Sequence, residues 1–460
     1  MLMDLLAPYK PRISGHTELR FQRNGARGVG LLKGNIVNNS SSESSGLSAR
    51  VYKGGFWGFA SGSEYDAKAV EAVLAAAERN ASFLNERLGS PKPPFKALAG
   101  GSASSKVTEV TDSEQKVFLD FAKEVDGYIA KKYPGLTSRS VSLRSDYIEK
   151  LFITSDGADG YSLIPRTFLY VDMTAMADDG SPIDLYEVFG GAGFFADRFG
   201  DPAGLFAGID AHHEKLMRKR EGVFAEAGSH EVILDAKLAG ILAHEAIGHT
   251  VEADLVMGGS VAGPYHGKLV ASEMVGLVDF ANTAMGAETP QPIYVDDEGT
   301  LAEDAVIIKD GVLTGFMHNR ETAEHFGHKP EGNARAYAFS DEPLIRMRNT
   351  AILPGESKVG DMIASIDDGY YFIQWNNGQA DLTSEFMFGV VEGYEIRKGR
   401  LGRALRNTTI SGVAFDMLKT VTMLSDDMDW TSNGMCGKKQ PLPTGMGGPA
   451  VKCRVNIGGR

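Results

Sequence analysis

Residues 244–249 read His-Glu-Ala-Ile-Gly-His, and they place two histidines and a glutamate in one short segment. In the common zinc-protease motif H-E-x-x-H, the histidines lie four residues apart on one helix face and the glutamate acts as general base. Here the histidines lie five residues apart. In a regular α-helix their rings would point about 140° apart. We therefore predict a π-type turn, a rare distortion that concentrates at functional sites, and Gly248 would ease it.

The sequence before this segment predicts the helix that carries it. Val232–Leu234 has the composition of a short strand, and Asp235 is suited to cap a helix. Helical spacing then relates four apolar residues that we expect to face a core, Leu238, Ile241, Leu242 and Ala246.

A catalytic zinc ion typically has three protein ligands and one open position, so two histidines are an incomplete set. Cys436 is the first candidate for the third ligand, because it lies in the glycine-flanked segment Gly434–Lys438. Glycines let the backbone approach a metal closely. A cation, including the side chain of Lys438, would stabilise the thiolate.

Two other residues compete for this position. Cys453 lies in the strand-like stretch Ala450–Val455, where a buried and inert thiol is the more common outcome. Glu252 follows His249 by three residues and would complete a His-His-Glu set like that of other zinc peptidases. The residues alone favour Cys436 only slightly over these alternatives.

Composition excludes several classes of protein. The chain has 460 residues, a formal net charge of −13 and two cysteines, which are too few for a disulfide framework. The negative charge argues against direct nucleic acid binding. No apolar run approaches the roughly 20 residues that span a bilayer, and Met1–Leu6 contains Asp4 and no cleavage pattern. We therefore expect a cytoplasmic protein without a membrane segment.

The first 225 residues have the pattern of a mixed α/β domain. Alternation predicts strands at Glu18–Gln22 and Ala49–Phe59, with a turn at Lys53–Phe56, whereas the Ser/Asn-rich run Asn38–Gly46 is typical of a flexible loop. Two helices are expected, one after Ser63 and Asp66 and one after Asp112 and Gln115, with a connector at Ser90–Lys106 between them.

Residues 226–460 have short β-rich runs separated by glycine turns. Hairpins are predicted at Ala305–Met317 and Phe386–Ile410. We therefore expect an α+β fold: an N-terminal α/β domain (1–225), and a C-terminal domain (226–460) dominated by antiparallel β-sheet with the histidine-bearing helix packed against it.

Other polar residues have less specific interpretations. His212 and His213 point to different helix faces and are expected at a solvated surface, as are His318, His325 and His328, although His318 could border a cleft. Arg335, Arg346 and Asp381 would either orient a substrate or form buried ion pairs.

Several segments match one known family in order. His244–His249 is followed by Glu252 and Asp254, and the further blocks are Gly55–Ala60, Gly332–Arg335, Arg346–Thr350, Gly389–Tyr394 and Gly434–Lys438. Together they resemble the TldD/PmbA (TldE) metallopeptidase family, and the HExxxH motif resembles that of its TldD-type subunit.

This resemblance implies a zinc peptidase with one Zn²⁺ per chain, held by His244, His249 and Cys436, in which Glu245 activates a zinc-bound water. It implies small or unfolded peptide substrates, as in leader-peptide or antitoxin processing. It also implies a dimer with an enclosed active site, formed with a PmbA/TldE-type subunit or with itself. The alternative is a non-catalytic zinc-containing module that regulates or binds a partner protein.

Overall fold

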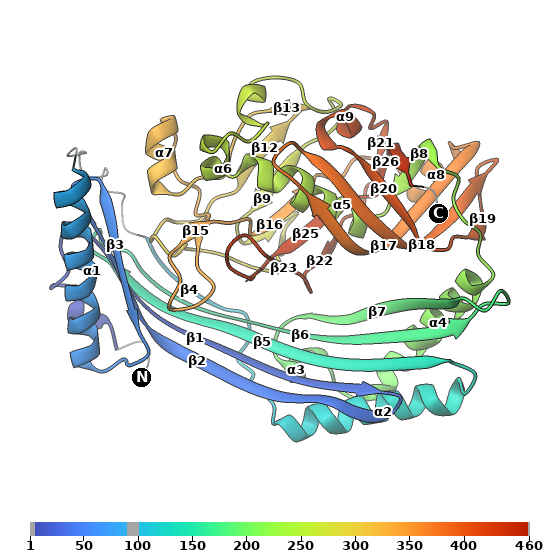
Figure 1. The fold of residues 1–460 in the computed structure, drawn as a ribbon, viewed down its shortest axis with the longest axis horizontal. Helices are drawn as coiled ribbons and strands as arrows, with labels where there is room; N and C mark the ends of the chain where they lie inside the picture. Colours follow the sequence, from blue (N-terminus) through green and yellow to red (C-terminus); the bar gives the residue numbers. More distant parts are fainter. Residues whose placement is uncertain (1–4, 90–100, 459–460) are drawn as a thin grey trace.

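A computed structural model describes residues 5–89 and 101–458. The protein has the expected α+β fold: a long sheet from the first half of the chain lies against a β-rich second half (Figure 1). In the first half the elements are β1 (His16–Leu32), β2 (Asn35–Lys53), β3 (Phe56–Gly62), α1 (Ala67–Leu88), β4 (Ser102–Lys106), α2 (Gln115–Lys132), β5 (Ser138–Thr154), β6 (Asp159–Met176), β7 (Pro182–Ala192), α3 (Phe195–Arg198) and α4 (Phe206–Arg220).

The first sheet has seven strands in the order β3-β2-β1-β5-β6-β4, with β7 also paired to β6. Apolar and polar residues alternate along β1, so its apolar side chains point to one face of the sheet and its polar side chains to the other. Leu19 and Phe21 pack under α1, while Val29 and Leu31 pack under α2. Both helices therefore cover the outer face of the sheet (Figure 1).

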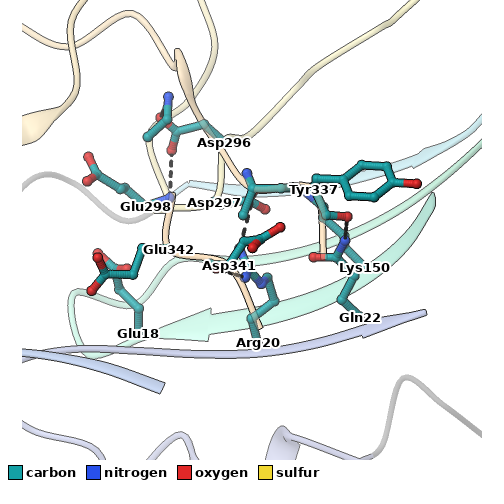
Figure 2. Close-up of polar contacts among 12 residues, drawn as sticks. Glu18, Arg20, Gln22, Lys150, Asp296, Asp297, Glu298, Tyr337, Asp341 and Glu342 are labelled. Atoms are coloured by element: carbon teal, nitrogen blue, oxygen red, sulfur yellow. Dashed lines mark hydrogen bonds and ion pairs between the residues drawn. The ribbon is translucent and has the colours of Figure 1, made fainter. Parts of the chain in front are cut away.

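The opposite face of the sheet carries charged side chains and meets loops of the second half. Arg50 binds Glu18 within the sheet and Glu298 across the boundary, with Nη2–Oε1 of 2.5 Å to Glu298. Lys150 donates to Asp297, also at 2.5 Å. Figure 2 shows Glu18 and Lys150 from the first sheet and Asp297 and Glu298 from the second half, which meet at this boundary. A buried ionic network thus joins the two halves.

In the second half, five described strands close a hydrogen-bonded ring, β17-β8-β26-β20-β18 and back to β17, while β9, β12, β13, β16, β22 and β25 form a separate six-stranded sheet. The strands are β8 (Gly228–Leu234), β9 (Leu277–Phe280), β10 (Thr283–Ala284), β11 (Ala287–Glu288), β12 (Ala305–Lys309), β13 (Val312–Leu313), β14 (Ala334–Arg335), β15 (Leu344–Ile345), β16 (Asn349–Ile352), β17 (Asp368–Ala380), β18 (Glu385–Arg397), β19 (Arg400–Ala404), β20 (Thr408–Val413), β21 (Met423–Leu424), β22 (Asp429–Thr431), β23 (Met435–Cys436), β24 (Leu442–Pro443), β25 (Gly445–Gly448) and β26 (Val451–Ile457).

The helices of the second half are α5 (Ala236–Leu242), α6 (Ala253–Met257), α7 (Arg320–Phe326), α8 (Val359–Ala364) and α9 (Ala414–Lys419). Helix α5 contacts β17 of the ring and β25 of the six-stranded sheet, so it lies between the two β systems. Its core-facing residues are those that the sequence predicts, since Leu238, Ile241 and Leu242 are all buried.

The structure corrects one predicted loop. Asn38–Ser44 is exposed, as its composition predicts, and Gly46 is buried, but all of Asn38–Gly46 belongs to strand β2 and pairs along its length with β1. Ser and Asn side chains are tolerated there because the backbone register with β1, rather than side-chain burial, holds the strand. Of the predicted connector Ser90–Lys106, residues 90–100 lie outside the described residues, and Ser102–Lys106 forms β4.

The predicted hairpin at Lys53–Phe56 and the predicted strand pair beginning at Ala305 are confirmed. The predicted domain boundary near residue 225 falls between α4 and β8, and it stays a prediction. None of the helices in the described residues has the length and apolar character needed to cross a membrane.

Candidate metal centre

The segment that joins α5 to α6 contains the predicted distortion. Ala243–Gly248 forms a π-helical turn, η4, and the His249 N–H donates to the His244 carbonyl five residues earlier. The rings of His244 and His249 consequently lie on one side of the segment, with centroids 5.3 Å apart and planes at 75°. The five-residue spacing therefore predicted this backbone geometry correctly.

The structure gives a different reason for Gly248 than the backbone freedom that the sequence suggested. Its φ of −53° and ψ of −48° are ordinary helical values, so no left-handed conformation requires a glycine. A Cβ atom at this position would instead lie 2.1 Å from Sδ of Met347, which is fully buried. Close packing against Met347, which lies between β15 and β16, therefore accounts for the glycine, and backbone freedom does not.

We expect Gly248→Ala to lower the free energy of unfolding by about 1–3 kcal/mol, because the added methyl group overpacks a filled core. Denaturant unfolding of the zinc-free protein measures this change. Gly127→Ala is the matched control, since its Cβ would meet nothing within 4 Å in the interior of α2. There the same substitution should raise stability by about 0.5–1 kcal/mol. Equal effects at both positions would contradict the packing argument.

Cys436 completes a compact group of ligand atoms. It lies on β23, which pairs with β24 in a short hairpin, and its Sγ is 3.4 Å from Nε2 of His249. The candidate ligand atoms of His244, His249 and Cys436 all lie within 4.8 Å of one another. Nitrogen and thiolate ligands of a tetrahedral zinc ion are separated by about 3.6 Å, given zinc bonds of about 2.0–2.3 Å. These residues can therefore hold such an ion with little rearrangement.

Glu252, the rival ligand, lies on the other edge of the His249 ring. Its Oε2 is 2.9 Å from Nδ1 of His249, while Nε2 of that ring faces Cys436. A carboxylate on the second nitrogen fixes the tautomer and orientation of a metal-binding histidine. The geometry therefore suits Glu252 to orient His249 rather than to bind the metal.

Lys438 also differs from its predicted role. Its Nζ donates to Asp254 at 2.8 Å and lies 3.4 Å from Glu252, so it pairs with these two carboxylates rather than with the thiolate. Cys453 is buried on β26, where burial raises the pKa of its thiol, and it is not part of the histidine–cysteine group.

The electrostatics of the centre favour an ionised sulfur atom. Burial would raise the pKa of the Cys436 thiol, but hydrogen bonds and charge interactions with His244 and His249 lower this pKa to about 3. Burial would likewise lower the pKa of His249, whereas its contacts with Cys436 and Glu252 raise the pKa to about 10. The sulfur is thus a thiolate, the form that binds metals.

Glu245 lies beside both imidazoles. Its carboxylate oxygens are 4.0 Å from Nε2 of His244 and 3.9 Å from Nε2 of His249. Its side chain is 27 % exposed, whereas that of His244 is 1 % exposed. The His249 side chain is 20 % exposed. The glutamate therefore lies with His249 on the open side of the centre, where a water molecule and a substrate can reach it.

Buried arginines surround the loop that carries Cys436. Arg346 is fully buried and donates to the carbonyls of Cys436 at 2.7 Å and Gln440 at 2.8 Å, and Arg335 donates to that of Pro443 at 3.0 Å. Both therefore bind backbone rather than carboxylates or an open cleft. Asp381 is exposed and caps its own turn. Sequence reasoning missed Arg166 of β6, which contacts the same loop and has no motif around it.

Two predicted surface histidines are buried. His212 and His318 are each 1 % exposed, and burial lowers the pKa of both to about 4, so both are neutral. His212 was wrongly placed because α4 packs against β7, which leaves only part of that helix in solvent. His318 follows Met317, whose backbone pairs with Val251 and Ala253 next to the centre.

Family models match the chain in three consecutive parts. The PmbA/TldA metallopeptidase domain 1 matches residues 17–81, the central domain matches 108–214, and the C-terminal domain matches 227–459. The last match includes every residue of the histidine–cysteine group.

Two curated relatives match over nearly their whole lengths. A metalloprotease of Methanocaldococcus jannaschii is 31% identical over 97% of both chains. A zinc metalloprotease TldD homolog of Saccharolobus solfataricus is 28% identical over 90% of both chains. Among solved structures, TldE from Thermococcus kodakarensis superimposes with a TM-score of 0.75 at 16% identity and covers all of both chains, which shows a shared fold.

Proposed function

The chain belongs to the PmbA/TldD metallopeptidase family, and from this premise we propose that it is a zinc-dependent peptidase of the TldD type. His244, His249 and Cys436 would hold one Zn²⁺ per chain. The name of the Saccharolobus solfataricus relative supports zinc, and so does the donor set of two imidazoles and a thiolate.

When bound at such a site, zinc polarises a peptide carbonyl and lowers the pKa of water towards neutrality. Glu245 is placed to accept a proton from the attacking water and to return it to the leaving amine. Glu252 keeps His249 oriented through Nδ1, and Lys438 lies 3.4 Å from the Glu252 carboxylate. The Cys436 thiolate adds a negative charge that offsets part of the charge of the metal.

The position of Glu245 is the observation that carries the proposal. A structural zinc site usually has four Cys or His ligands and does not need a partly exposed glutamate beside two of them. The carboxylate within 4.0 Å of both Nε2 atoms therefore favours catalysis over a non-catalytic module that only binds a partner.

Substrate and assembly follow from the family resemblance. We propose small or unfolded peptides as substrates, of the kind processed as leader peptides or antitoxins, which would bind as extended chains through main-chain hydrogen bonds. We also propose that the chain is a cytoplasmic protein and works as a dimer, with itself or with a PmbA/TldE-type subunit. The TldE structure supports this pairing through its shared fold alone.

Peptide cleavage tests this function directly. The purified chain, alone and mixed with a PmbA/TldE-type subunit, is incubated with an unstructured peptide before and after removal of zinc by a chelator. We expect cleavage that stops when zinc is chelated and returns when zinc is added. This cleavage should occur at least in the mixture with the PmbA/TldE-type subunit, and also in the single chain if the chain pairs with itself. Absence of cleavage in both preparations at full zinc occupancy would favour the non-catalytic alternative.

A further inference from the structure

We propose that Arg166, on the sheet of the first half, is a positioning residue for the metal centre in the second half. It would set metal affinity by holding residues 432–436, called here the ligand loop, in the position that presents the Cys436 thiolate. The inference rests on the proposed function, because it takes Cys436 as a zinc ligand.

Strand register places Arg166 on the polar face of the first sheet. Arg166 lies directly opposite Asp146 on the neighbouring strand, and Tyr170 lies opposite Ser142. Lys150 is four residues beyond Asp146 on β5, and side chains with even spacing along a strand share a face. Arg166 and Tyr170 therefore project towards the second half, on the same face as the ionic network of Figure 2.

Arg166 contacts three residues of the ligand loop. Its Nη1 donates to the carbonyls of Ser432 at 3.0 Å and Gly434 at 2.9 Å, and its Nη2 lies 2.8 Å from Sδ of Met435. Its Nε donates to Asp146 at 2.7 Å, which fixes the plane of the guanidinium. The side chain is only 5 % exposed, so these contacts are shielded from water.

Tyr170 and Arg346 also donate hydrogen bonds to the ligand loop. The Tyr170 hydroxyl donates to the carbonyl of Asn433 at 3.3 Å. From the second half, Arg346 donates to the carbonyl of Cys436 itself. Two buried guanidinium groups, one from each half of the protein, thus hold the carbonyls on both sides of the metal-binding sulfur.

The loop has little structure of its own to fix the sulfur. Within residues 432–436, regular pairing is limited to the two-residue strand β23. Metal–ligand distances vary by only about 0.2 Å between sites, and loss of a group that orients a ligand typically lowers metal affinity by about 10–100-fold. The first sheet supplies none of the three candidate ligands, yet zinc affinity should depend on its Arg166.

The competing explanation is that Arg166 only helps the two halves dock. Arg20 provides a matched control for that effect. It projects from the same sheet, is equally buried, and donates to the carbonyls of Asp341 at 2.7 Å and Ala338 at 3.2 Å in the second half. It binds a different loop, so its loss should weaken docking without moving Cys436.

The experiment compares Arg166→Lys, Arg20→Lys and Cys436→Ala in the full chain. Zinc affinity is measured by competition with a chelator, and Co²⁺ substitution reports the thiolate–metal bond through its absorption band. We expect Arg166→Lys to weaken zinc binding by about 10–100-fold and to reduce or shift the cobalt–thiolate band. Arg20→Lys should lower thermal stability while keeping zinc affinity within about threefold of the unmodified protein, since only docking is affected.

Each result decides a separate question. Equal zinc affinities of Arg166→Lys and Arg20→Lys would overturn the positioning role. An unchanged affinity in Cys436→Ala would instead overturn the ligand assignment on which the role depends. If Arg166→Lys does not fold, Asp146→Asn replaces it, because that variant keeps the arginine and removes the carboxylate that orients it. It should weaken zinc binding in the same direction, and no weakening would overturn the proposal.

Discussion

Replacement of Glu245 by glutamine is expected to lower kcat for peptide cleavage by about 10²–10⁴-fold, the usual contribution of a general base, while bound zinc is retained. Glutamine preserves the shape of the side chain but cannot accept a proton from water. KM should change little, because Glu245 lies beside the ligands and is not needed to bind the peptide backbone. The measurements are steady-state cleavage of an unstructured peptide and zinc content of the same preparation.

Glu273→Gln is the control for this variant, since Glu273 is an exposed glutamate of the same half. It should cleave at the rate of the unmodified protein. Full activity in Glu245→Gln would show that another group accepts the proton. Loss of zinc together with activity would mean that Glu245 acts on the metal site itself.

Replacement of Cys436 by alanine is expected to remove zinc at concentrations that saturate the unmodified protein. Structural zinc sites with four ligands bind with about 10–16 kcal/mol, so one ligand contributes roughly 3 kcal/mol, or more than a hundredfold in affinity. Chelator competition and zinc content measure the loss. Peptide cleavage should disappear at the same zinc concentrations.

Two further variants separate the three candidate ligands. Cys453→Ala should retain zinc, because Cys453 lies outside the group of ligand atoms. Glu252→Ala should weaken zinc binding by about 10–100-fold, the effect expected when a residue that orients a ligand is lost. Zinc loss in Glu252→Ala but not in Cys436→Ala would reverse their roles.

The helix of the candidate metal centre could be predicted from local sequence because its signals are local. Apolar spacing gave the buried side of α5, and the five-residue interval between His244 and His249 gave the π turn. The choice among Cys436, Cys453 and Glu252 could not be made in this way. It depends on which side chain lies next to Nε2 of His249 in space, and the family resemblance rather than the spacing favoured Cys436.

Errors arose where neighbours distant in the sequence determine the environment. Asn38–Gly46 has the composition of a loop, but pairing with β1 makes it a strand. His318 has the local context of a surface residue and is nevertheless buried. Arg166 lies in an unremarkable strand, and only the docking of the two halves brings it to Ser432 and Gly434 of the ligand loop, 266 and 268 positions further along the chain.

The unequal faces of the first sheet affect how the two halves come together. Its outer face is apolar, and α1 and α2 shield it from water. Both helices belong to the first half, so this burial does not need the second half. Its inner face carries charged side chains, which stay hydrated until the two halves dock. Complementary charges therefore select one orientation when the two halves assemble. A mismatched orientation is unfavourable, because it would bury those charges without water or an ionic partner.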